Sequence, residues 1–233
     1  MIHIIRRDLN SLSDKEKANT YLRFFKTGKG EYGEGDVFLG VTMPKIRILA
    51  KNVNAINIKE VEILLHSKIH EERMLALIIL VNKFKKADND EKGVIYDLYL
   101  RNTNFINNWD LVDLTASNIV GAYTYNNDTN ILTTLAKSDS LWERRIAIVS
   151  THYFIKQNKY SYTLNISTIL LSDKHDLIHK AVGWMLREVG KKDIKVLKHF
   201  IKLNYSNIPR TTLRYAIERF PDILRLKYLK NIY

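Results

Sequence analysis

The three tryptophans of the chain each lie next to charged side chains. They occur in the segments 108–113 (NWDLVD), 141–145 (LWERR) and 183–188 (GWMLRE). In a helix, Trp109 and Asp113 are four residues apart and therefore share one face. An indole ring beside a carboxylate, with guanidinium groups supplied from neighbouring segments, suits a cationic sugar flanked by phosphates. The combination points to chemistry on nucleic acid.

Asp113 interrupts an apolar helix face to which Leu111, Val112 and Leu114 contribute. Burying a carboxylate without a partner is costly, so its presence requires a reason. One reason is structural, such as a helix cap or an ion pair with an arginine, and the spacing alone favours this interpretation. The other reason is functional, a carboxylate held in a cleft. We expect Asp110 to cap or orient the first helical turn, where negative charge is favourable.

The tryptophans and arginines of these segments also have two interpretations. Trp109, Trp142 and Trp184 would by default pack in the core or between repeats, but a tryptophan at the start of an inner helix could equally face a cleft. Arg145 and Arg187 would by default pair with nearby glutamates. On a basic concave wall they would instead bind phosphate, which a guanidinium group matches in a bidentate manner.

Other patterns typical of catalytic sites are weak. Two histidine pairs at a spacing of four, His66 with His70 and His175 with His179, each supply only half a metal site. We interpret both as polar helix surface and expect no metal. The segment 28–37 contains a dinucleotide-type glycine pattern (GKGEYG), but no strand precedes it. We interpret it as a flexible Gly-rich connection.

The charge of the chain is its strongest compositional feature. The net charge is +12, and the segment 180–233 holds thirteen basic and four acidic residues, a net charge of +9. A one-sided basic surface is typical of a polyanion binder, although a solvated lysine-rich surface gives the same count. The absence of cysteine excludes disulfides, thiolate nucleophiles and Cys-ligated zinc. It fits a reducing compartment, so we expect a cytoplasmic location.

No segment predicts a membrane protein or a secreted one. The longest apolar run, 74–81, is too short to span a bilayer. Arg6, Arg7 and Asp8 follow the start so closely that we expect no signal peptide.

Apolar periodicity predicts an all-α chain. Apolar residues recur at spacings of three and four without strand alternation. Pro44 and Pro209 each follow a capping residue and predict helix starts. Ser140 and Glu143 have the spacing of a capping box.

Similar helical cores recur along the chain, at 73–77, 144–148, 180–184 and 213–217. Each contains a small residue, and these residues step by multiples of about 35, the spacing of stacked antiparallel helix pairs of HEAT type. We therefore predict one HEAT-like repeat domain over residues 1–233, a curved α-solenoid with a concave basic face. Its parts would be N-terminal helices at 1–27, the Gly-rich loop at 28–37 and repeats at 38–233.

A family resemblance extends over almost the whole chain. It is carried by the joint order and spacing of the segments 33–36, 38–41, 109–113, 141–145, 180–188, 209–211 and 214–218, together with Pro44 and Arg47. In this order they resemble the AlkD-like DNA alkylation repair glycosylases, a family of HEAT-like repeat proteins. The resemblance implies a monofunctional enzyme that removes N3- and N7-alkylated purines from duplex DNA. It also implies that the lesion stays outside any base-specific pocket.

The resemblance assigns roles to individual residues. The aspartate and the two tryptophans that the family places at the lesion correspond to Asp113, Trp109 and Trp184, and its arginine corresponds to Arg145. We expect further DNA contacts from the matched basic residues and from the turn before Arg47: Arg187, Thr42, Met43, Pro44, Arg47, Lys180, Lys191 and Arg214.

The implied chemistry is hydrolysis of a bond to a leaving group that is already cationic. Bond breaking leaves an oxocarbenium-like deoxyribose. Asp113 would stabilise that charge and orient the attacking water. Trp109 and Trp184 would pack on the sugar, and Arg145 would hold the adjacent phosphate. The mechanism requires no cofactor, and we expect a monomer.

Two other functions fit the same sequence. A non-catalytic repeat protein could use the same basic surface to bind branched or damaged DNA. A HEAT scaffold could instead bind an acidic protein partner, and the salt dependence of DNA binding would separate that case.

Overall fold

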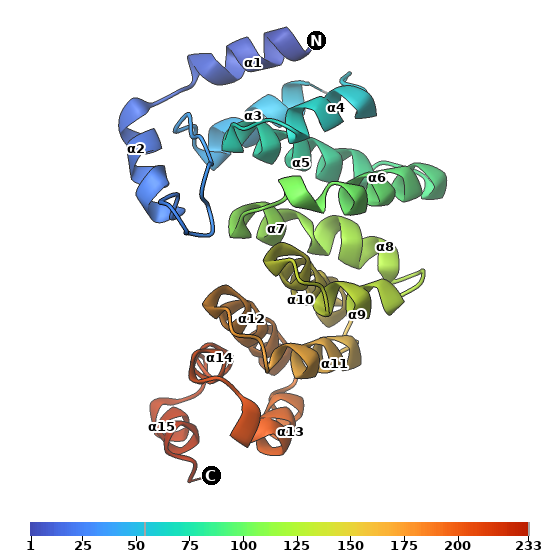
Figure 1. Cartoon of the computed structure of the whole chain (residues 1–233). Coiled ribbons are helices and arrows are strands. Elements are labelled where there is room, and N and C mark those ends of the chain that lie inside the picture. Colours follow the sequence, from blue (N-terminus) through green and yellow to red (C-terminus); the bar gives the residue numbers. More distant parts are fainter. Residues whose placement is uncertain (54, 233) are drawn as a thin grey trace. The chain divides into compact units, whose positions relative to one another are not determined.

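A computed structural model describes residues 1–53 and 55–232. The chain divides into two compact units, Met1–Thr115 (unit 1) and Ala116–Tyr233 (unit 2). The described residues form helices and connecting segments, and their only β-type pairing is an isolated bridge between Val37 and Ile69 (Figure 1). The predicted all-α class is confirmed. The single domain and the curved shape stay predictions.

Unit 1 contains α1 (Ile2–Ser11), α2 (Lys15–Phe24), α3 (Met43–Asn52), α4 (Ile58–Leu65), α5 (His70–Phe84), α6 (Asn89–Arg101), the 3-10 turn η1 (Thr103–Phe105) and α7 (Trp109–Thr115). Unit 2 contains the π-helical turn η2 (Ser117–Gly121), α8 (Ala122–Thr124), α9 (Asn130–Ala136), α10 (Leu141–Lys156), α11 (Ser161–Leu170), α12 (Asp176–Lys192), α13 (Ile194–Asn204), the 3-10 turn η3 (Tyr205–Asn207), α14 (Arg210–Ala216) and α15 (Asp222–Lys230).

Helix starts follow the local signals in the sequence. Thr42 is the N-cap of α3, and Pro44 lies in its first turn, where its missing amide hydrogen costs no bond. The side chain of Ser140 caps α10 by accepting a hydrogen bond from the Glu143 amide at 3.4 Å. α14 begins at Arg210, so Pro209 is its N-cap rather than a residue of its first turn.

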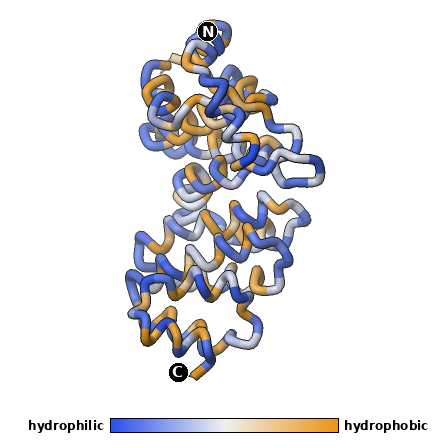
Figure 2. The backbone as a smooth tube through the Cα atoms, turned by 90° about the vertical axis from the view of Figure 1, so that its left-hand side faces the viewer, coloured by the Kyte–Doolittle hydropathy of each residue, from blue (hydrophilic) through white to orange (hydrophobic). Residues whose placement is uncertain are grey.

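The core of unit 1 is organised around α5. This helix packs against α3, α4, α6 and α7, and nearly every residue along it is buried, including the apolar run 74–81. Figure 2 shows hydrophobic and hydrophilic stretches alternating within the helices. Such amphipathic helices can pack their apolar faces against a buried helix such as α5. None of the helices in the described part of the chain combines the length and apolar character that crossing a membrane requires.

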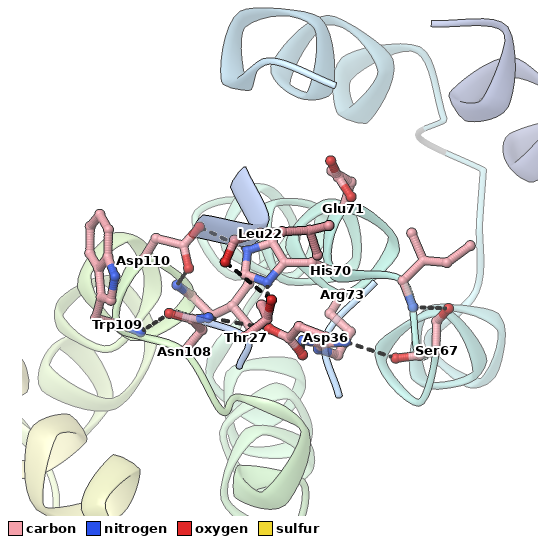
Figure 3. Close-up of polar contacts among 12 residues, drawn as sticks. Leu22, Thr27, Asp36, Ser67, His70, Glu71, Arg73, Asn108, Trp109 and Asp110 are labelled. Carbon is pink, nitrogen blue, oxygen red and sulfur yellow. Dashed lines mark hydrogen bonds and ion pairs between the residues drawn. The ribbon is translucent and has the colours of Figure 1, made fainter. Parts of the chain in front are cut away.

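The first turn of α5 carries a buried ion cluster, which we call the Asp36 cluster (Asp36, His70, Arg73 and Asp110, with the amide of Asn108). Asp36 accepts hydrogen bonds from Arg73 Nη2 at 2.6 Å, His70 Nδ1 at 3.2 Å and Asn108 Nδ2 at 3.2 Å. His70 Nε2 lies 2.9 Å from Asp110 Oδ2 (Figure 3). The cluster joins the segment before α3 to α5 and to the start of α7.

Protonation states follow from these contacts. Burial lowers the pKa of His70, but the hydrogen bond and charge of Asp110, with the bond to Asp36, outweigh it and raise the pKa from 6.5 to about 9. Burial raises the pKa of Asp36, but the bond from His70 and the charge of Arg73 bring it below its ordinary value. The positively charged His70 and Arg73 therefore balance the carboxylates of Asp36 and Asp110. The interpretation of His70 as polar helix surface is wrong, because His70 is 3% exposed.

A second buried acid fastens the segment after the glycines. Glu71 accepts hydrogen bonds from the amides of Leu39, Gly40 and Val41 at 2.8–3.2 Å. Together with Asp36, it fixes the chain between the Gly-rich loop and α3. The 28–37 segment is non-helical, but its last residues take part in the core and do more than connect two helices.

Unit 2 is a stack of helix pairs. α9, α11 and α13 lie on one side, and α10, α12 and α14 on the other (Figure 1). The predicted inner-helix cores fall on α10, α12 and α14, and their small residues Ala147, Gly183 and Ala216 are buried. A Cβ atom on Gly183 would lie 2.5 Å from Tyr215 Cβ and 2.6 Å from the Thr212 carbonyl oxygen. The absence of a side chain lets α12 and α14 approach closely.

The raised pKa of His70 predicts a pH-dependent stability. A folded-state pKa above the unfolded value of 6.5 stabilises the protein fully below pH 6.5, and this contribution is lost as the pH rises through about 9. His70→Gln should cost about 3–5 kcal/mol of unfolding free energy at pH 6.5, because it leaves buried carboxylates short of a cation. Urea unfolding at pH 6.5, 8 and 9.5 should show the difference from wild type shrinking as the pH rises. A constant difference would contradict the assigned charge state.

Gly183→Ala should destabilise the protein by about 1–3 kcal/mol, since the new methyl group meets backbone and Cβ atoms of α14. Gly190→Ala on the same helix is the matched control. Its Cβ would lie 2.4 Å from Leu197 Cδ2, the end of a side chain, and its nearest contacts include no backbone atom, so this variant should lose less stability. Urea unfolding of both variants measures the effect, and equal stabilities would show that the α12–α14 approach is not tight.

Candidate functional site

Unit 1 contains a cavity of about 350 Å³ between α2, α3, α5 and α7, which we call the α7 cavity. Its wall consists of aromatic, aliphatic and acidic side chains with one histidine: Tyr21, Phe24, Phe25, Phe38, Val41, Met43, Ile46, His70, Glu71, Met74, Trp109, Asp110, Asp113 and Leu114. Both residues singled out by their spacing, Trp109 and Asp113, line it. The predicted shared face of α7 is confirmed.

Stacked rings form one side of the cavity. Trp109 stacks on Phe25 with ring centroids 5.4 Å apart, and Phe25 stacks on Phe38 at 5.0 Å. Phe24 meets Trp109 edge to face at 5.7 Å. Phe24 is 60% exposed, whereas Phe25 and Phe38 are buried. Phe24 therefore forms the open rim of the aromatic wall.

The start of α7 is positioned by its neighbours. The carboxylate of Asp110 accepts from the Leu111 amide at 2.9 Å and reaches His70 with its other oxygen, so the expected orienting role of Asp110 is confirmed. At the other end of α7, the hydroxyl groups of Thr115 and Tyr99 lie 2.9 Å apart. These contacts hold the helix that presents Trp109 and Asp113 to the cavity.

Asp113 is half-buried on the cavity wall. It is close enough to Tyr99 that its negative charge adds to burial in raising the pKa of that phenol. The spacing in the sequence favoured a structural role for Asp113, as a helix cap or an ion-pair partner. Its position on a cavity wall is the geometry expected for the functional alternative, a carboxylate held in a cleft. The catalytic role of Asp113 itself stays a prediction.

The formal charge of the cavity wall is negative. Glu71, Asp110 and Asp113 contribute three carboxylates, and His70 contributes one protonated imidazole. No lysine or arginine is among the wall residues. In a chain with a net charge of +12, this cavity is a local exception that favours a cationic occupant.

The turn before α3 contributes one residue to the wall. Met43 lines the cavity, Thr42 is half-buried, and Pro44 and Arg47 are exposed. Of the expected DNA contacts in unit 1, Pro44 and Arg47 are thus accessible to a large ligand.

In unit 2, four of the expected residues form a stripe on α12. Lys180, Trp184, Arg187 and Lys191 are separated by four, three and four residues, which places them on one face of the helix. The ring of Trp184 lies 5.9 Å from that of His152 on α10. Burial and the charge of Lys156 lower the pKa of His152.

The basic residues of this stripe have acidic neighbours. Lys180 lies 2.7 Å from Asp176, and Lys191 lies 2.7 Å from Glu188. Arg187 pairs with Glu218 in the turn after α14 and lies 3.8 Å from Glu188. The default interpretation of Arg187 as an ion-pair partner is confirmed.

Two further expected DNA contacts differ in accessibility. Arg145 is 5% exposed, and its Nη1 donates to the carbonyl oxygen of Leu177 at 2.5 Å. Arg214 on α14 is exposed. Both assignments stay predictions.

The other three histidines of the two sequence pairs each contact a protein group. His175 is the N-cap of α12 and accepts a hydrogen bond from the Leu177 amide at 3.2 Å; burial lowers its pKa. His179 Nε2 contacts the Asp173 carbonyl oxygen at 2.6 Å. His66 Nε2 lies 2.6 Å from Asn102 Oδ1. Within 1–53 and 55–232, no group of three potential ligands is arranged to hold a metal ion.

Sequence reasoning missed the Asp36 cluster and most of the aromatic wall. Asp36 lies in a segment that carries the family resemblance, and this is the only signal that marked it. Phe24 and Phe25 precede the Gly-rich segment, where adjacent aromatics could have indicated a packed wall. Their proximity to Trp109 depends on contacts between residues far apart in the sequence.

Comparisons with known proteins place the chain in a family. A search of curated protein sequences finds no match. The fold is similar to that of a solved structure from Enterococcus faecalis, described as a predicted DNA alkylation repair enzyme. The TM-score is 0.71 and the identity 16%, over 90% of this chain and 97% of that chain. The model of the family described as DNA alkylation repair enzyme matches residues 5–220. Because this match spans most of the sequence, the chain belongs to the DNA alkylation repair enzyme family.

Proposed function

We propose that the protein is a DNA glycosylase that hydrolyses the N-glycosidic bond of N3- and N7-alkylated purines. The observation that carries the proposal is the placement of Asp113 beside Trp109 on the wall of a negatively charged aromatic cavity, in a member of a DNA alkylation repair family.

The chemistry requires little from the protein beyond charge and orientation. Alkylation makes the purine cationic, so it departs without a strong general acid. As the C1′–N bond breaks, its electron pair moves to the base and positive charge develops on deoxyribose. The Asp113 carboxylate stabilises that charge, orients a water molecule toward C1′ and accepts its proton.

Trp109 and Trp184 have supporting roles in this proposal. Each offers an indole face that can pack on the sugar, and a cation–π contact contributes about 0.5–2 kcal/mol when a cation lies over the ring. Trp109 is held by Phe25 in unit 1, which fixes its orientation before the substrate arrives.

DNA binding is proposed to use the α12 stripe of unit 2. Lys180, Arg187 and Lys191 supply positive charge at helical spacing, and Trp184 lies between them. Their ion pairs with glutamate and aspartate are partly exposed, and exposed ion pairs contribute little stability and exchange readily for phosphate. Arg47 and the exposed Arg214 are proposed as further backbone contacts.

Arg145 is proposed to hold the phosphate next to the lesion. Its guanidinium group is 5% exposed, so DNA binding has to uncover it. If it remains covered, it instead supports α12 through the Leu177 carbonyl.

Asp113→Asn should reduce release of 7-methylguanine from methylated duplex DNA by a factor of about 10² or more, because the amide cannot stabilise positive charge. Affinity for the duplex should change little. Free base detected by chromatography under single-turnover conditions provides the measurement. The matched control is Asp97→Asn, an exposed acid on α6, which should behave like wild type. Release by Asp113→Asn at the wild-type rate would refute the catalytic assignment.

Lys191→Gln should weaken binding to any duplex and reduce the slope of log affinity against log salt by about one, as expected when one phosphate contact is lost. Fluorescence anisotropy with unmodified duplex from 50 to 200 mM salt measures it. Lys85→Gln, at an exposed site after α5, is the control and should leave the slope unchanged. Identical slopes in both variants would remove Lys191 from the DNA interface.

A further inference from the structure

Another cavity of unit 1, which we call the α6 cavity, lies between α3, α4, α5 and α6. Its volume of about 460 Å³ falls in the range of ligand pockets, about 300–1,000 Å³. We propose that it docks an acidic segment of a partner protein, with an apolar side chain of that segment inside the cavity and its carboxylates at two lysines of the wall. This inference goes beyond the proposed function and does not depend on it.

The α6 cavity and the Asp36 cluster lie at opposite ends of α5. His70 begins this helix, and Lys83, in its last turn, lines the α6 cavity. The two residues are 13 positions apart, which corresponds to about 20 Å along the helix axis. None of the residues assigned above to DNA or to the reaction is part of the wall. The α6 cavity is therefore separate from the α7 cavity.

Much of the wall is apolar, and part of it is open to water. Ala50, Ile79 and Ile95 line the cavity, and each is at most 3% exposed. Val94 on α6 lines it too, but 53% of this side chain is exposed. An apolar group that filled the cavity would remove this surface from water, which is favourable.

Two lysines give the wall positive charge. Lys83 is half-buried in the last turn of α5, and Lys86 is exposed in the turn that follows. Both line the cavity. Within 1–53 and 55–232, neither ammonium group forms an ion pair with a carboxylate. Both charges are therefore available to an anionic ligand.

The acid of the wall has a role within α6. Glu91 accepts a hydrogen bond from the Asp88 amide at 3.3 Å, and Asp88 accepts one from the Glu91 amide at 2.9 Å. This capping box holds the start of α6, where the positive end of the helix partly offsets the carboxylate charge. Among the described wall residues, two cations thus face one acid.

Apolar surface and positive charge together favour an amphipathic anion. The backbone of DNA would satisfy the lysines but leave the apolar wall uncovered. A second copy of this chain is disfavoured, since each copy carries a net charge of +12. An apolar residue flanked by aspartate or glutamate satisfies both features, because the apolar side chain anchors in the cavity and the carboxylates meet the lysines.

The open rim favours a protein segment over a small molecule. Lys86, Glu91 and Val94 are all exposed wall residues, so an occupant is covered on one side only. Small ligands usually have about 70–90% of their surface buried in their pockets. A side chain that projects from a larger partner requires no such enclosure, because the rest of the partner covers it.

The test is a selection of peptides from a random library displayed on phage, with the immobilised full chain as the target. We expect the selected peptides to share a bulky apolar residue flanked by aspartate or glutamate. Selection of basic or uncharged peptides, or no enrichment at all, would overturn the proposal.

A selected peptide with a fluorescent label then locates the site by anisotropy titration. Lys86→Gln should weaken its binding by a factor of about 2–5, as expected for the loss of one exposed ion pair. Lys85→Gln is the matched control, because Lys85 is exposed in the same turn but is absent from the wall. Equal weakening by both substitutions would show attraction to the general positive charge and reject the α6 cavity.

The apolar contact is tested in the same titration. Val94→Glu should weaken binding by a factor of about ten or more, because it places a carboxylate where the peptide needs an apolar wall. Ile63→Glu is its control, since Ile63 on α4 is 49% exposed and absent from the wall. Circular dichroism confirms that both variants are folded. Wild-type affinity in Val94→Glu would place the peptide elsewhere and overturn the proposal.

Calorimetry with decanoate separates a partner segment from a small amphipathic acid. The peptide should bind more tightly, because it brings carboxylates on both sides of its apolar residue. Tighter binding of decanoate would make the cavity a small-molecule site and reject docking. Release of 7-methylguanine by Lys86→Gln should match wild type, so the docking inference and the proposed function are tested separately.

Discussion

Four ionisable groups from three separate segments meet in unit 1, three of them buried and Asp110 half-buried, and they position the segments around α5. Asp36 precedes α3, His70 and Arg73 begin α5, and Asp110 begins α7. A single buried charge would be costly, but two cations and two carboxylates in contact compensate one another. Because removing one member leaves its partners uncompensated, the cluster disfavours arrangements that separate these segments.

This constraint determines the candidate site. Asp110 is joined to His70, so α7 begins at a fixed place beside α5, and Trp109, Asp113 and Leu114 of this helix line the cavity. The excess of carboxylates on that wall follows from the same contacts. Acidic residues fasten α7 and the segment before α3, and their charges remain beside the rings of Trp109 and Phe25. The local field is opposite in sign to the net charge of the chain.

The helices and much of their packing could be predicted from the sequence, because they depend on local periodicity. Apolar spacing predicts helices, and proline and serine mark their starts. The small residue at 183 predicts a close helix contact, since the absence of Cβ acts wherever that residue meets α14. The shared face of Trp109 and Asp113 is equally local, because α-helical geometry alone requires it.

The environment of each side chain was decided by the tertiary structure. The pairing of His70 with His66 at a spacing of four predicted a histidine on the polar helix surface. In the structure His70 is buried, and Asp36 and Asp110, 34 and 40 residues away, contact its ring and keep it charged. The family resemblance places Arg145 at a DNA phosphate, but its side chain is 5% exposed. Sequence spacing fixes which residues share a helix face. Burial and pKa depend on which distant segments cover that face, and only the folded chain brings those segments together.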